Sequence, residues 1–289
     1  MTDLDPDQEI VVGIDPRDPA VPALAWAADE AERRALPLRL VLALPPLHDT
    51  PHVDPKPRRL ALHAQGQEAL TAAAQTIARL TPRVRVVTEL VDGQPAAVLC
   101  RRANPPTRMV VVGSRRLSRP EEILSASSVA APLSAQAACP VVVVRAPEHL
   151  AHRPAHLVVG VDGSMPSREA LKFAFEEADV RGVLVHAVLV WQRSALTFGE
   201  PEPEERTRLL AEAVAEWSDR YPDVQSRQEV RQGHPVEELA LASSTALALI
   251  VGRRGRGGYT GMRLGSVAHG LLHRAECPVI TVPGNDERR

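Results

Sequence analysis

Short apolar runs alternate with amphipathic segments along the whole chain. The runs are rich in Val and Ile, which is typical of strands buried on both faces of a parallel sheet. The longer segments between them carry apolar residues at helical spacing. This pattern predicts strands over 9–14, 38–44, 84–90, 108–113, 140–145, 156–162, 183–190, 225–231, 246–252 and 278–282, and helices over 20–35, 58–80, 95–103, 125–137, 166–180, 202–220, 235–243 and 265–275.

Four sequence blocks occur twice in the same order, about 140 residues apart. Ile10–Asp15 (IVVGID) corresponds to Leu157–Asp162 (LVVGVD), and the other pairs are DGQPAAVL with QGHPVEEL, MVVVGSR with LIVGRR, and ACPVVVV with ECPVITV. Because the order is kept, we interpret the chain as a tandem duplication. Strands that alternate with helices predict an α/β, Rossmann-like fold with two doubly wound five-stranded parallel sheets, in domains 1–147 and 154–289.

Composition narrows the class of protein. The length of 289 residues suits two domains, and the 44% hydrophobic and 24% charged residues are ordinary for a soluble protein. A net charge of -2 does not favour nucleic acid or an anionic membrane as partner. No apolar run approaches the roughly 18 residues of a membrane span, and the acidic N-terminus is unlike a secretory signal. Three scattered cysteines, without a C-x-x-C pair, predict a cytoplasmic protein without a disulfide framework.

The fourth strand of the second half is followed by a glycine loop. Gly252 and Gly255 precede a helix that is expected to begin near Gly265 and Ser266. Glycines let the backbone approach a phosphate closely and take positive φ, and a helix start offers free N–H groups and the positive end of its dipole. Asp162, at the end of the neighbouring strand, can accept a hydrogen bond from an adenine amino group or a ribose hydroxyl. Three arginines add positive charge to the loop: Arg253, Arg254 and Arg256. A glycine turn that binds nothing is the plain alternative.

The spacing G-x2-G-x9-G-S, with VGVDGS after the first strand and CPV before the last, resembles the universal stress protein family and its ATP-binding branch. The resemblance covers nearly the whole chain, as two tandem domains. It implies the strand order 3-2-1-4-5 in each domain. It also implies ATP as cofactor, with or without Mg²⁺. Asp162 would contact adenine, Ala187 would line the base by its backbone, and Val251 and Gly252 would sit near the ribose. The phosphates would be held by Gly255, Gly265, Ser266 and Val267.

The first half departs from this motif. Asp15, Gly113 and Ser127 match Asp162, Gly252 and Ser266, so they are weaker candidates for nucleotide contacts. Arg116 and Ala126 stand where Gly255 and Gly265 stand in the second half. We therefore expect weaker binding by the first half, whose alternative role is structural or regulatory.

The other candidate motifs and residue clusters favour plainer interpretations. The chain has no P-loop, no dinucleotide fingerprint and no nucleophile elbow. His269 and His273 are spaced as a metal pair on a helix, and three more histidines crowd the linker, but solvated surface histidines are commoner. Basic patches around the two loops lack the interleaved aromatic residues of a nucleic-acid surface. Cys139 and Cys277 each precede a proline, and buried packing is favoured over redox sensing.

These features predict an ATP-binding stress-response or signalling module with no assigned catalytic residue. A slow ATPase or adenine-nucleotide hydrolase is one rival, and an interaction protein whose loop binds nothing is another. The last strands, Val141–Val144 and Val279–Val282, are expected at sheet edges, where unpaired strands invite pairing. We therefore expect an intramolecular pseudo-dimer of the two halves, with a homodimer of the whole chain as a further option; the sequence does not identify a protein partner.

Overall fold

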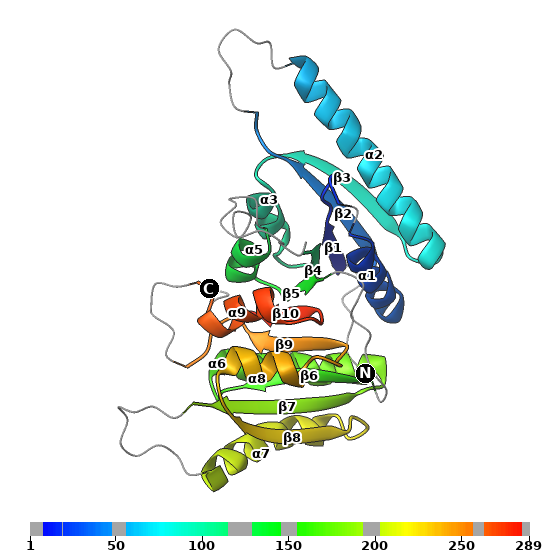
Figure 1. Cartoon of the computed structure of the whole chain (residues 1–289). Coiled ribbons are helices and arrows are strands. Elements are labelled where there is room, and N and C mark those ends of the chain that lie inside the picture. Colours follow the sequence, from blue (N-terminus) through cyan, green and yellow to red (C-terminus); the bar gives the residue numbers. More distant parts are fainter. Residues whose placement is uncertain are drawn as a thin grey trace. The chain divides into compact units, whose positions relative to one another are not determined.

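The chain folds into two compact units, Met1–Ala146 and Pro147–Arg289. The computed structural model describes residues 8–18, 20–47, 56–114, 129–145, 155–192, 203–256 and 263–284. Strands and helices alternate in both units (Figure 1).

The first unit is a five-stranded parallel sheet with helices between the strands. Its pairings join β2 to β1 and β3, and β4 to β1 and β5, which gives the order β3-β2-β1-β4-β5. The elements are β1 (Glu9–Gly13), α1 (Val21–Arg34), β2 (Leu38–Leu44), α2 (Lys56–Leu80), β3 (Val86–Asp92), α3 (Pro95–Arg102), β4 (Thr107–Gly113), α5 (Ala130–Gln136) and β5 (Val141–Val144).

The second unit repeats this arrangement. Its parallel pairings join β7 to β6 and β8, and β9 to β6 and β10, in the order β8-β7-β6-β9-β10. The elements are β6 (His156–Val161), α6 (Met165–Arg181), β7 (Leu184–Trp191), α7 (Pro203–Arg220), β8 (Ser226–Gln232), α8 (Pro235–Ala242), β9 (Ala248–Gly252), α9 (Ser266–Arg274) and β10 (Val279–Val282). The predicted α/β fold class is confirmed.

Two predicted strands begin later than expected, because a turn uses their first residues. The strand predicted from residue 84 begins at Val86, since the N–H of Val84 closes a turn on the carbonyl of Thr81. The strand predicted from residue 246 begins at Ala248, since the N–H of Ala246 donates to the carbonyl of Ser243. The helix predicted over 125–137 spans Ala130–Gln136, and its first predicted turn lies outside the described residues.

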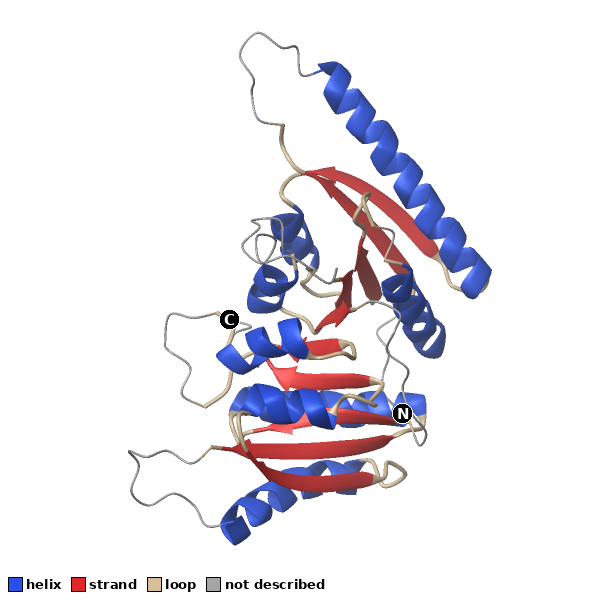
Figure 2. Cartoon of the chain, viewed as in Figure 1, coloured by secondary structure: helices blue, strands red, loops and turns tan. Residues whose placement is uncertain are grey.

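Helices cover both faces of each sheet (Figure 2). In the second unit α6 packs on β6, β9 and α7, while α8 packs on α9 and β7. The central strand β6 is therefore apolar through Leu157, Val158 and Val159, whereas β8 at the outer edge begins with exposed polar residues. No helix in the described part of the chain is long and apolar enough to cross a membrane.

The two cysteines that precede prolines are packed in the interior. Cys139 and Cys277 are 6% and 0% exposed. Burial raises the pKa of the Cys139 thiol to about 12, which leaves almost no reactive thiolate at neutral pH. The predicted packing role is therefore confirmed by burial.

Each unit buries one ion pair at the same place on its first helix. Arg34 pairs with Glu30 on α1, and Arg181 pairs with Glu177 on α6 through Nε and Oε2 at 3.2 Å. Both glutamates are 0% exposed. A buried carboxylate requires such a partner, because an uncompensated charge in the interior costs several kcal/mol. The repeated pair thus marks a constraint that both units share.

We expect Glu177→Leu to lower the free energy of unfolding of the second unit by about 3 kcal/mol, because the buried Arg181 guanidinium loses this carboxylate. The double variant Glu177→Leu/Arg181→Met should recover most of the loss. Urea denaturation in a Trp26→Phe background, followed by the fluorescence of the two remaining tryptophans of the second unit, Trp191 and Trp217, measures the change.

The matched control is Glu212→Leu, which removes an exposed pair with Arg208 on α7 and should change stability by less than about 0.5 kcal/mol. A double variant that is as unstable as Glu177→Leu alone would contradict the ion-pair explanation.

Candidate functional site

Asp162 lies where β6 turns into α6. The turn is short because Gly163 adopts φ 77°, in the left-handed region that glycine enters readily. Ser164 is the N-cap residue of α6, and its hydroxyl accepts a hydrogen bond from the N–H of Ser167 at 3.3 Å. The helix therefore begins directly beside the Asp162 side chain.

The Asp162 carboxylate joins the ends of two strands. Its Oδ1 accepts hydrogen bonds from the N–H of Ser164 at 2.9 Å and from the Ser164 hydroxyl at 2.6 Å. Its Oδ2 accepts the N–H of Arg256, in the glycine loop after β9, at 2.8 Å. Burial alone would raise the pKa of Asp162, but the hydrogen bonds from Ser164, Arg256 and Ser167 outweigh it and hold the pKa below its ordinary value.

Two of the predicted glycines permit close packing at this junction. A Cβ on Gly255 would collide with Oδ2 of Asp162, and a Cβ on Gly252 would lie 2.7 Å from the carbonyl carbon of Pro166. A Cβ on Gly265 would make an ordinary contact of 3.4 Å with the Arg253 carbonyl oxygen. None of these three loop glycines adopts a φ in the left-handed region. Gly252 and Gly255 instead provide the space that a Cβ would occupy.

The start of α9 meets the glycine loop. The N–H of Gly265 donates to the carbonyl of Arg253 at 2.9 Å, which ties the helix start to the residue after β9. Gly265 is the N-cap residue with φ -69° and ψ 153°, and no side chain among the described residues caps the helix. The first-turn N–H groups, including those of Ser266 and Val267, have no partner within the helix. An anion can therefore bind at this end of the helix dipole.

Arginine side chains make the surroundings electropositive. Arg253 is only 6% exposed, and burial together with the charges of Arg254 and Arg263 lowers its pKa to about 10. It therefore remains protonated at neutral pH. The guanidinium of Arg256 lies over Gly163, where a Cβ would be 3.3 Å from Nη2. Positive charge thus gathers around both strand ends.

Two predicted contacts, Ala187 and Val251, lie inside the sheet. Ala187 is 0% exposed and pairs with Val159, whereas Leu189 is the β7 residue that pairs with Val161, next to Asp162. Val251 is 4% exposed. Both side chains belong to the core, and the predicted lining of the base by the Ala187 backbone and the predicted place of Val251 near the ribose stay predictions.

The corresponding strand end of the first unit has a different loop. Val21, the first residue of α1, follows Asp15 by six positions, whereas Met165 follows Asp162 by three. Oδ1 of Asp15 accepts the N–H of Arg17 at 2.9 Å, within its own loop. A Cβ on Gly113 would collide with Ala20, which has φ 41°. The other first-half candidates, Arg116, Ala126 and Ser127, lie outside the described residues.

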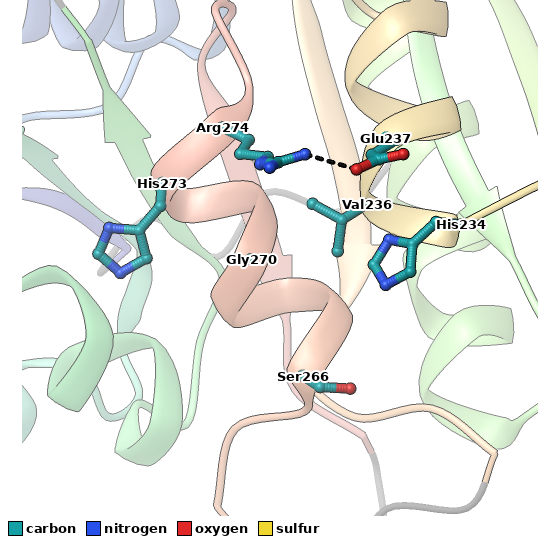
Figure 3. Close-up of a pocket in the computed structure, with 7 residues that line it drawn as sticks. All are labelled: His234, Val236, Glu237, Ser266, Gly270, His273 and Arg274. Atoms are coloured by element: carbon teal, nitrogen blue, oxygen red, sulfur yellow. Dashed lines mark hydrogen bonds and ion pairs between the residues drawn. The ribbon is translucent and has the colours of Figure 1, made fainter.

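A pocket of about 420 Å³ lies between α8 and α9 (Figure 3). Gly270 allows the two helices to approach, because a Cβ there would lie 2.7 Å from Val236. The wall of the pocket includes an ion pair between Arg274 Nη1 and Glu237 Oε1 at 2.8 Å. The other lining residues are His234, Ser266 and His273, so only Ser266 belongs to the predicted phosphate contacts.

The histidines do not form a metal centre in the described part of the chain. The rings of His269 and His273 lie 4.8 Å apart, edge to face. No group of three metal-ligating side chains occurs among the described residues. Of the three linker histidines, His156 begins β6, and His149 and His152 lie outside the described residues.

A charged cluster inside the second unit was not predicted from the sequence. His186 Nε2 lies 2.8 Å from Glu229 Oε2, and Glu229 Oε1 accepts the Nε–H of Arg231 at 2.9 Å. The His156 ring is 6.3 Å from that of His186. In the first unit, Arg39 takes the place of His186 and contacts Glu89 and Glu9. The available signal was the single histidine in the otherwise apolar strand β7.

Known proteins match both units. The Universal stress protein family model matches residues 8–145 and 155–283. A universal stress protein of Mycobacterium tuberculosis is 35% identical over 286 residues, with 94% of this chain and 95% of the relative covered. One from Mycolicibacterium smegmatis is 33% identical, with coverage of 94% and 96%. The crystal structure of a universal stress protein from Archaeoglobus fulgidus has a TM-score of 0.73 at 17% identity, covers 96% of this chain and 97% of its own, and shares the fold.

We expect the pKa of the His186 imidazole to lie below its ordinary value of 6.5. Burial disfavours the charged form, and Arg227 and His156 add to this effect. Together they outweigh Glu229, which favours the charged form. The folded state then binds fewer protons than the unfolded state. The stability contribution of neutral His186 is therefore present above pH 6.5 and is lost as the pH falls through the folded-state pKa. NMR titration of the His186 ring proton measures the midpoint.

The control for this titration is Glu229→Gln, which removes the carboxylate that attracts the imidazolium and should lower the midpoint further. A wild-type midpoint above 6.5 would show that burial does not dominate, and a rise in the variant would show that Glu229 does not favour the imidazolium.

Proposed function

The chain belongs to the universal stress protein family, and we propose that its second unit binds ATP and acts as a stress-response or signalling module. One observation carries the proposal: the uncapped start of α9 lies beside a glycine loop that packs directly against Asp162. Unpaired backbone N–H groups at a helix start are suited to phosphate. The loop supplies the close backbone approach that a polyphosphate needs.

The charges of the loop support a polyanionic ligand. Burial lowers the pKa of Arg253 most, and repulsion from Arg254 and Arg263 lowers it further. A triphosphate placed at the α9 start would offset that repulsion, and arginine forms strong charge-assisted hydrogen bonds with phosphate. Magnesium, where it accompanies ATP, would be held mainly by phosphate oxygens.

The first unit is proposed to bind nucleotide weakly. The loop after Asp15 is longer, and it engages that carboxylate with the N–H of Arg17. The sequence also places Arg116 where the second unit has Gly255. A side chain there would collide with a carboxylate held as Asp162 is held.

Binding without efficient hydrolysis is favoured by the state of Asp162. A general base works best with a pKa near the working pH, whereas hydrogen bonds lower that of Asp162. The ATPase alternative requires sustained, magnesium-dependent turnover that Asp162→Ala abolishes. The alternative of an interaction protein requires purified chain that carries no nucleotide and shows no thermal shift with ATP.

We expect Gly265→Asp to reduce ATP affinity at least about tenfold in calorimetry, since it places a carboxylate at the N-cap of α9, where it competes with phosphate for the same N–H groups. An aspartate N-cap is favourable for a helix, so the melting temperature should not fall. Loss of ATP with an intact fold therefore identifies the α9 start as the phosphate site.

Two further variants make this comparison specific. Gly265→Asn caps the same N–H groups without a charge and should reduce affinity less than Gly265→Asp. Ala126→Asp changes the corresponding sequence position of the first half and should leave most of the binding intact. Equal losses of ATP affinity in Gly265→Asp and Ala126→Asp would contradict the proposed asymmetry between the two units. Mass spectrometry of ligand released from the purified protein gives the number of nucleotides bound per chain.

Pairing of the two halves along their last strands, and a homodimer of the whole chain, stay predictions. Light scattering on the purified chain measures the second. A cytoplasmic location likewise stays a prediction from the cysteine content.

A further inference from the structure

We propose that Arg256 determines specificity for the base: its guanidinium provides a plane on which the purine ring of the nucleotide stacks. The inference rests on the proposed nucleotide site, and it names the group in that site that would favour a purine over a pyrimidine. Arginine is suited to this role, because its planar cation packs on the faces of aromatic rings and of nucleic-acid bases.

The Arg256 guanidinium lies flat on the turn that follows β6. A Cβ placed on Gly163 would lie 3.3 Å from Nη2, 3.4 Å from Cζ and 3.7 Å from Nε of Arg256. Such similar distances to three atoms of one rigid plane put that Cβ above the face of the guanidinium and not beside its edge. Gly163 permits this packing, because it has no side chain and adopts φ 77°.

The other face of the guanidinium is left for a ligand. Arg256 is exposed, and its guanidinium makes no hydrogen bond or ion pair with any other residue that the structure describes. Its main chain is nevertheless fixed, because the N–H of Arg256 donates to Oδ2 of Asp162 at 2.8 Å. The side chain therefore extends from an anchored point and carries a planar cation that is accessible from one side.

This plane lies beside the carboxylate that is expected to contact adenine. An ionised carboxylate offers about four acceptor positions. The N–H and hydroxyl of Ser164 and the N–H of Arg256 occupy three of those on Asp162. The remaining position can accept a hydrogen bond from the amino group of adenine. Asp162 would then hold the edge of the base while Arg256 supports its face.

The positive charge for the phosphates comes from other arginines of the loop. Arg253 and Arg254 directly follow β9, and the carbonyl of Arg253 accepts the N–H of Gly265 at the start of α9. Arg256 instead lies over the turn at the end of β6. The phosphate and base ends of the site thus have separate cations, and a change at Arg256 should act on the base.

The first unit lacks both parts of this arrangement. Pro16 follows Asp15 where Gly163 follows Asp162, and Leu117 stands where Arg256 stands. Leu117 lies outside the described residues, but a leucine has no planar cation in any conformation. The absence of this stacking group from the first-half sequence agrees with the weaker nucleotide binding that is proposed for that unit.

The first experiment separates the plane of Arg256 from its charge. Arg256→Lys keeps the charge and removes the plane, whereas Arg256→Gln removes both. Calorimetry with ATP should show a loss of affinity of about three- to tenfold in each variant, the size of a partly exposed cation–π contact. Inorganic tripolyphosphate, which has no base, should bind both variants as it binds the wild type.

Two outcomes of this experiment would overturn the proposal. Arg256→Lys that binds ATP as tightly as the wild type would show that charge, and not the plane, is what the site uses. A parallel loss of ATP and tripolyphosphate would place Arg256 on the phosphates. The matched control is Arg208→Lys, an exposed arginine on α7, which should change neither affinity.

The second experiment measures the preference for purines directly. Wild-type protein should bind ATP more tightly than UTP, because the larger ring covers more of the guanidinium, and Arg256→Lys should reduce this ratio. An unchanged ratio in the variant would contradict stacking on Arg256. If the wild type binds neither ATP nor tripolyphosphate, the proposed function is wrong. If the wild type and both Arg256 variants bind ATP equally well, only the role of Arg256 is wrong.

Discussion

The close approach of two strand ends is the constraint on which the site depends. The chain after β9 passes so near β6 and α6 that Gly252 and Gly255 have no room for a Cβ. The Asp162 carboxylate fills the remaining space and binds backbone N–H groups from both sides. A side chain at either glycine would separate the loop from the strand end, and the amides of the α9 start would then face open solvent alone.

The charges at this junction favour a negatively charged ligand. The hydrogen bonds that Asp162 accepts keep its carboxylate ionised despite burial. The same hydrogen bonds hold the loop in place. The pKa of Arg253 is lowered mainly by burial, and repulsion from Arg254 and Arg263 adds to this effect. The Asp162 carboxylate thus organises the junction from within, and the junction remains electropositive toward solvent. That combination suits a ligand with several negative charges.

The two units agree in their interiors and differ at their strand ends. Both place a glutamate–arginine pair at the same buried position of the first helix, because each helix must cover the same sheet face. The interior still tolerates an exchange of partners, as Arg39 with Glu89 becomes His186 with Glu229. The strand ends do not share this agreement, and the loops after Asp15 and Asp162 fold differently.

The sequence by itself determined the alternation of strands and helices, the duplication and the position of the glycine loop. These follow from local periodicity and short spacings, which a single chain segment carries. It placed the α9 start correctly at Gly265 and Ser266, because a helix start is local. Only the tertiary structure decided that Gly255 faces Asp162, that Ala187 lies inside the sheet beside Val159, and that His186 meets Glu229. Strand register and the packing of distant segments create these contacts, and neither is encoded in any one segment.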